Sequence, residues 1–105
     1  MPQLTVYKNK NPRSKATFPL LVDVQSDLLD DLQTRVVIPL SKAVVLTKNP
    51  VSQLTPILDF EGDAYVLMTP QLAGVARNEL GTVTGSLAGH RDTILAALDF
   101  LLTGF

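Results

Sequence analysis

The side chains that most often carry out catalysis are few in this chain of 105 residues. It has no cysteine and a single histidine, His90, which excludes disulfides, thiolate chemistry and a cysteine-ligated zinc site. His90 stands beside Asp92 at the expected start of a helix, where a surface or capping role fits it better than catalysis. Ser86, His90 and Asp92 could be written as a triad, but nothing around Ser86 resembles the strained turn that carries a serine nucleophile. We therefore expect no catalytic residue and no enzyme activity.

Acidic residues form two groups that could be considered for cation binding. Their spacing matches no calcium loop, and turns and solvated strand ends explain such residues better. Alternation along a strand places Asp23 and Gln25 on one face, whereas Asp30 and Asp31 are expected to end a strand in a turn. We predict no metal site and no cofactor. The two groups are Asp23, Asp27, Asp30 and Asp31, and Asp59, Glu61 and Asp63.

Large apolar side chains at unusual positions are the remaining candidates for function. Leu28 and Leu29 are adjacent, and on a strand only one of two neighbours can point inward. Phe100 and Phe105 raise the same question near the end of the chain. Together they indicate a surface for a partner, either a second copy of the chain or a separate target.

Composition limits the remaining classes of function. Hydrophobic residues make up 46% of the chain and charged residues 18%, and the net charge is −1. These values predict one folded domain, residues 1–105, with little attraction for nucleic acid or membranes. Lys8, Lys10, Arg13 and Lys15 form a basic cluster, for which a solvated loop, an acidic partner and nucleic acid all remain open. No signal peptide or membrane span is apparent, so we expect the protein in the cytoplasm.

The elements that position these residues are short strands followed by one helix. Alternation and β-branched runs predict strands at 4–7, 20–25, 35–38, 44–46, 54–60, 64–68 and 75–80, within about 3–83, with a hairpin turn at 61–63. Pro39 is expected to close its strand or to lie on an edge, and Gly81 to stop the last one. From about 88 to 103 the apolar period becomes helical, and residues 94, 95, 97, 98, 101 and 102 form one arc. Consecutive strands without intervening helices predict a mainly β protein, an antiparallel sheet or small barrel, with one C-terminal α-helix.

Four segments in this order resemble the CcdB family of toxins from bacterial toxin–antitoxin modules. They are LVDVQSD (21–27), RVVIPL (35–40), MT (68–69) and the ending TGF (103–105), and the spacing fits over essentially the whole chain. The resemblance implies the SH3-like antiparallel barrel of the CcdB/MazF-like toxin fold and a two-fold symmetric homodimer. It also implies poisoning of DNA gyrase, in which the toxin binds the A subunit of the enzyme and traps the cleaved gyrase–DNA complex.

By position, the resemblance implies a gyrase-binding surface that includes the two apolar clusters noted above. Its residues are Leu28, Leu29, Asp99, Leu102, Thr103, Gly104 and Phe105. It also implies a cognate antitoxin that neutralises the toxin through a disordered acidic segment. By charge alone, Lys8, Lys10, Arg13 and Lys15 are candidates for that contact.

Two positions depart from the family pattern. Well-known members carry Trp immediately before the final Gly, where this chain has Thr103, and Asn where it has Asp99. Loss of the indole removes stacking area, so poisoning could be weaker. Two alternatives therefore stay open: an endoribonuclease toxin on the same barrel, which would draw on Arg13, Arg35 and Thr69, and a non-toxic homologue that only binds antitoxin.

Overall fold

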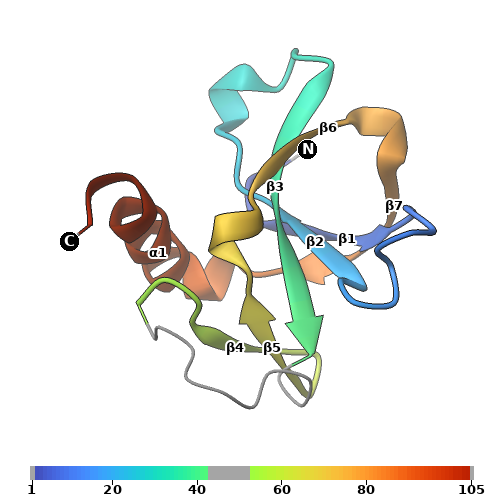
Figure 1. The fold of residues 1–105 in the computed structure, drawn as a ribbon. Coiled ribbons are helices and arrows are strands. Elements are labelled where there is room, and N and C mark those ends of the chain that lie inside the picture. The colour runs from blue at the N-terminus through green and yellow to red at the C-terminus, as the bar shows by residue number, and fades with distance from the viewer. Residues whose placement is uncertain (1, 43–52, 105) are drawn as a thin grey trace.

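A computed structural model describes residues 2–42 and 53–104. Within them seven strands precede one α-helix, connected by short 3-10 turns (Figure 1). The expected strand at 44–46 lies outside the described residues. The elements are β1 (Thr5–Asn9), β2 (Leu20–Asp23), β3 (Thr34–Lys42), β4 (Ile57–Phe60), β5 (Asp63–Leu67), β6 (Ala73–Ala76), β7 (Leu80–Ser86) and α1 (Arg91–Thr103).

All described strands belong to one antiparallel sheet in the order β4-β5-β3-β2-β1-β7, with β6 paired to β3. The sheet curves into a half-barrel, and α1 packs beside it and contacts the 3-10 turn η3 (Thr69–Gln71). The prediction of a mainly β, antiparallel fold with one C-terminal helix is confirmed. The predicted hairpin is also present: Glu61 and Gly62 form a two-residue turn, both at positive φ, between the paired residues Phe60 and Asp63.

Pro39 lies inside β3, so the prediction that it would close the strand or mark an edge was wrong. On one side β3 pairs with β2 through residues 37–40, but on the other side it changes partner along its length. Its first half pairs with β6 up to Val37, and its second half pairs with β5 from Leu40. Pro39 falls at this junction, where its carbonyl accepts a bond from the Met68 N–H at 2.9 Å. A missing N–H is tolerated there because no continuous ladder crosses that point.

Gly81 does not end a strand, which corrects a second prediction. The segment predicted as one strand at 75–80 is split between β6, the turn η4 (Arg77–Glu79) and the start of β7, which runs on to Ser86. A Cβ at Gly81 would lie 2.6 Å from the Lys8 carbonyl oxygen, and one at Gly85 would lie 2.9 Å from the Phe60 ring. These glycines therefore allow close packing within the sheet rather than breaking it.

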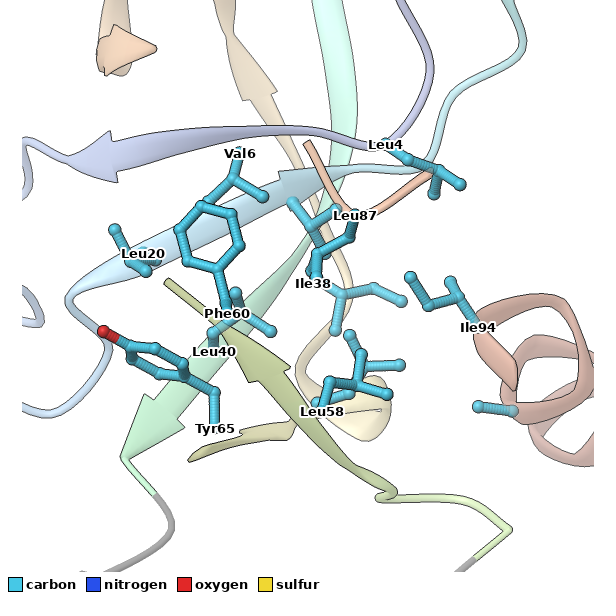
Figure 2. Close-up of a cluster of buried hydrophobic side chains, with 13 residues drawn as sticks. Leu4, Val6, Leu20, Ile38, Leu40, Leu58, Phe60, Tyr65, Leu87 and Ile94 are labelled. Atoms are coloured by element: carbon cyan, nitrogen blue, oxygen red, sulfur yellow. The ribbon is translucent and has the colours of Figure 1, made fainter. Parts of the chain in front are cut away.

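The core lies between the concave face of the sheet and α1 (Figure 2). Strand residues such as Val6 and Ile38 are fully buried in it, and Ile94 and Ala97 enter it from the helix. The buried strip of the helix is narrower than the predicted arc, because Leu102 in the last turn is 79% exposed. The apolar end of α1 is thus not required for the core.

Candidate target-binding surface

The loop between β2 and β3 presents apolar side chains to solvent. It contains the 3-10 turn η1 (Asp27–Leu29), in which Leu28 is 94% exposed and Leu29 is 49% exposed. The sequence pattern left open whether one of the pair points inward, and the structure buries neither. Leu32, which sequence reasoning did not select, is 48% exposed in the same loop.

Local hydrogen bonds explain why this loop turns at η1. The Ser26 hydroxyl accepts from the Leu28 N–H at 3.2 Å and caps the turn. The Asp27 carboxylate accepts from the Gln3 N–H at 2.6 Å, which ties the turn to the segment before β1. Ser26 and Asp27 therefore serve turn geometry, as the sequence predicted for the acidic residues of this segment.

The end of α1 forms a second apolar patch. Leu102 is largely exposed there, and Asp99 and Thr103 are exposed beside it. The Thr103 hydroxyl donates to the Asp99 carbonyl at 2.7 Å, so it bonds within the helix. Gly104 adopts the left-handed conformation with φ of 79° and closes the helix through its N–H to the Phe100 carbonyl. Phe105, the remaining residue predicted for this site, lies outside the described residues.

One copy of the chain does not join these two patches. The β2–β3 loop and the C-terminal end of α1 lie apart (Figure 1). The structure therefore groups the predicted residues into two sets, Leu28 with Leu29 and Asp99 with residues 102–104.

Beneath the β2–β3 loop lies a buried ion pair that sequence reasoning missed. Asp23, which we assigned with the other acidic residues to turns and solvation, is fully buried, so that prediction was wrong for this residue. Its Oδ2 accepts from the Nε of Arg35 at 2.8 Å, and the Arg35 side chain is also fully buried. Asp23 lies on β2 and Arg35 on the neighbouring strand β3. An Asp and an Arg at positions that share one face of such strands are the only signal of the pair in the sequence.

Electrostatics keep the buried Arg35 side chain charged. Burial alone would lower the pKa of Arg35, but the hydrogen bond and charge of Asp23 outweigh it and raise the pKa above its ordinary value. Arg35 Nη1 also donates to Asp30 at 3.1 Å, which links the pair to the loop. Burial, followed by the charge of Asp23, raises the pKa of the Tyr7 hydroxyl nearby.

Lys8 of the predicted basic cluster lies in β1 and the other three cationic residues lie on the β1–β2 connection, and all four are exposed. Asn9 fixes this connection by donating to the Ser14 hydroxyl at 3.0 Å and to the Phe18 carbonyl at 2.8 Å. Beside it runs a groove of about 460 Å³ with an apolar floor that includes Phe18, Leu21 and Val75. A second, shallower groove is lined by Lys8, Lys10 and Lys15.

The residues considered for catalysis do not form a site. His90 precedes the first residue of α1 and makes no side-chain capping bond, and the Ser86 hydroxyl accepts from the Ala88 N–H at 3.1 Å. Arg35 and Thr69, on which the endoribonuclease alternative would draw, are both fully buried.

In the part of the chain that the structure describes, no three acidic or histidine side chains are grouped to hold a metal ion. Residues 2–42 and 53–104 also contain no helix with the length and apolarity of a membrane span.

Comparison with protein-family models identifies the chain. The family model described as CcdB protein matches residues 3–104, which covers every described element and all predicted site residues except Phe105. The chain belongs to the CcdB protein family.

Proposed function

We propose that this protein binds the A subunit of DNA gyrase through the β2–β3 loop and the end of α1, and so traps the cleaved gyrase–DNA complex. Toxins of the CcdB family are non-enzymatic gyrase poisons. The observation that carries the proposal for this chain is the exposure of Leu28 and Leu102, 94% and 79%, at positions where folding does not require them. Exposed leucines that add nothing to the core are available for a partner.

The mechanism is selective binding of one state of the target. A poison accelerates no reaction, and it must bind the cleaved-DNA state of gyrase more tightly than the state that follows religation. To change a population ratio from 1:99 to 99:1, the two affinities must differ by about 10⁴-fold. An apolar surface that is fixed before binding suits this role, because little ordering cost is subtracted from the contact energy.

A homodimer would combine the two patches, which one copy holds apart. A two-fold axis repeats each patch, so that two helix ends and two loops face one symmetric receptor. We propose that the two helix ends lie near this axis and address a site between two copies of gyrase A. Gly104 would let the backbones approach closely, and Phe105 would supply aromatic area.

We further propose that a cognate antitoxin binds at the basic cluster. Lys8, Lys10, Arg13 and Lys15 suit an acidic disordered segment, and the neighbouring groove offers an apolar floor for its larger side chains. Lys10 Nζ donates to the Asn78 carbonyl at 3.0 Å, which holds one cation at the edge of this groove.

The direct test is a cleavage assay with purified gyrase, supercoiled plasmid and ATP. Trapped complexes release linear DNA after denaturation and protease treatment, and we expect linear DNA in proportion to added toxin. The matched control is Leu28→Asp, which should retain the fold but yield no linear DNA. Absence of linear DNA with the unmodified protein would contradict poisoning, and normal growth on expression would then favour the non-toxic homologue. RNA cleavage without gyrase would favour the endoribonuclease alternative.

A further inference from the structure

Leu32 shares the β2–β3 loop with Leu28 and Leu29 but follows η1 by three residues. Its N–H donates to the Leu29 carbonyl at 3.2 Å, so the turn that begins at η1 continues to it. Its side chain is 48% exposed, close to the 49% of Leu29. The loop therefore presents three leucines to solvent.

Arg77, from a distant part of the chain, holds the loop at Leu32. Its Nε donates to the Leu32 carbonyl at 2.8 Å, and its backbone N–H donates to the Gln33 carbonyl at 3.2 Å. Its Nη2 lies 3.6 Å from Oδ1 of Asp30. The guanidinium can contact the Leu32 carbonyl and Asp30 together because its donors are fixed in one plane.

Buried polar groups hold the other half of the loop. Gln25 donates from Nε2 to the Leu29 carbonyl at 2.9 Å and accepts from the Val36 N–H at 3.0 Å. Arg35 donates to Asp30 at 3.1 Å. Polar side chains therefore bind the inner side of the loop, through backbone carbonyls and one carboxylate, while its leucines remain exposed.

We propose that Leu32 is a third contact leucine of the β2–β3 loop, within the target-binding surface, and that Arg77 is the positioning residue that places it. This inference rests on the proposed function and extends the gyrase-binding surface to two residues that neither the sequence pattern nor the family resemblance assigned. Aspartates 27, 30 and 31 alternate with the leucines along the loop. Asp27 and Asp30 already have partners within the protein. The matching site on gyrase A is therefore an apolar recess for the three leucines.

A double-mutant cycle tests the link between the two residues. Leu32→Ala and Arg77→Ala are each expected to weaken binding to purified gyrase A by on the order of tenfold. If Arg77 acts by placing Leu32, the double variant binds no more than about twofold more weakly than either single variant. If the affinity loss of the double variant equals the product of the two single losses, Arg77 contributes independently of Leu32, and its positioning role is overturned. Wild-type affinity in Leu32→Ala would overturn the contact itself.

Two further variants separate position from charge and stability. Arg77→Lys keeps the charge but loses the planar Nε donor, so it should behave like Arg77→Ala; full affinity would refute positioning through Leu32. Ile57→Ala changes an apolar side chain that is 56% exposed on β4 and should leave affinity unchanged. Thermal unfolding of each variant shows whether the fold is retained.

Amide hydrogen exchange of the free protein makes the test independent of gyrase. Loss of the Arg77 side-chain bonds in Arg77→Ala should accelerate exchange in residues 28–33 and leave the core strands unchanged. If the unmodified protein does not bind gyrase A, both the proposed function and the contact role of Leu32 fail. Faster exchange would still support placement of the loop by Arg77, and unchanged exchange would refute it.

Discussion

Truncation of Leu28 should separate target binding from folding more cleanly than any other single substitution. Its side chain is 94% exposed, so Leu28→Ala removes almost nothing that the folded chain buries. Surface substitutions of this kind usually change the free energy of unfolding by no more than about 0.5 kcal/mol. We therefore expect the thermal unfolding of the variant to match that of the unmodified protein.

The expected loss of binding follows from the carbon atoms removed. Leu28→Ala deletes three apolar groups, and each contributes about 0.8 kcal/mol when it is buried in an interface. The sum is about 2.4 kcal/mol, which corresponds to a roughly 50-fold increase in Kd because each 1.4 kcal/mol is a factor of ten. This loss of binding free energy is the value for a Leu28 side chain that the target buries completely.

Isothermal titration of gyrase A with each variant measures this difference. Ile57→Ala is the matched control, since it removes the same number of carbon atoms from a side chain that is 56% exposed on an edge strand. A Kd within about threefold of the unmodified protein, well under the tenfold that 1.4 kcal/mol represents, would refute the assignment of Leu28 to the interface. Equal losses in both variants would instead show that binding depends on general surface hydrophobicity.

Three further outcomes test other parts of the structure. Asp23→Asn should destabilise the protein by about 3–5 kcal/mol in urea unfolding, because it removes the buried counterion of Arg35 and leaves only the partly exposed Asp30 to pair with it, whereas Asp63→Asn in the exposed hairpin should not. Deletion of residues 104–105 should abolish gyrase-dependent toxicity but change the free energy of unfolding by no more than about 1 kcal/mol; a folded truncation that remains toxic would contradict the site. The raised pKa of Tyr7 means that the folded state holds the phenolic proton more tightly than the unfolded state, whose value is near 10.0. The contribution of the Tyr7 proton to the free energy of unfolding is therefore fully present below pH 10 and is lost as the pH rises above it. Tyr7→Phe should reduce this loss of stability, measured as the urea midpoint from pH 9 to 12.

Local pattern was enough to predict the fold class and most element positions. The two-residue turn at Glu61 and Gly62 needs positive φ at both residues, which makes glycine a reliable signal. The change from alternating to helical period before Ile94 marks the last element equally clearly. These features depend only on neighbours in the sequence.

The errors concern residues whose surroundings come from distant parts of the chain. Pro39 is acceptable inside β3 only because β5 and β6 meet opposite it. Gly81 is required by contact with Lys8, more than seventy residues earlier. Asp23 can be buried because the Arg35 side chain reaches it from the next strand. None of these partners can be paired from one sequence without knowing the strand register.

The same reasoning explains why the candidate surface was only partly predictable. Leu28 and Leu29 attract notice because two adjacent leucines cannot both point inward on a strand. Leu32 follows two aspartates and gives no such conflict, and Arg77, whose side chain donates to the Leu32 carbonyl, comes from a distant part of the chain.

The side chains that hold the β2–β3 loop in place differ from the leucines that the loop presents to a partner. The bonds that shape the β2–β3 loop use backbone groups and polar side chains, and none of them uses a leucine side chain. A change at Leu28 therefore alters the contact with a partner without altering the loop, whereas a change at Arg35 alters both. If the two patches bind the target together across a dimer, weaker contact at the end of α1 can be offset by stronger contact at the β2–β3 loop. Thr103 bonds within α1 and adds little apolar surface, so among the described residues the three loop leucines should contribute more to target affinity. Substitutions at these leucines should therefore reduce affinity more than substitutions at Thr103.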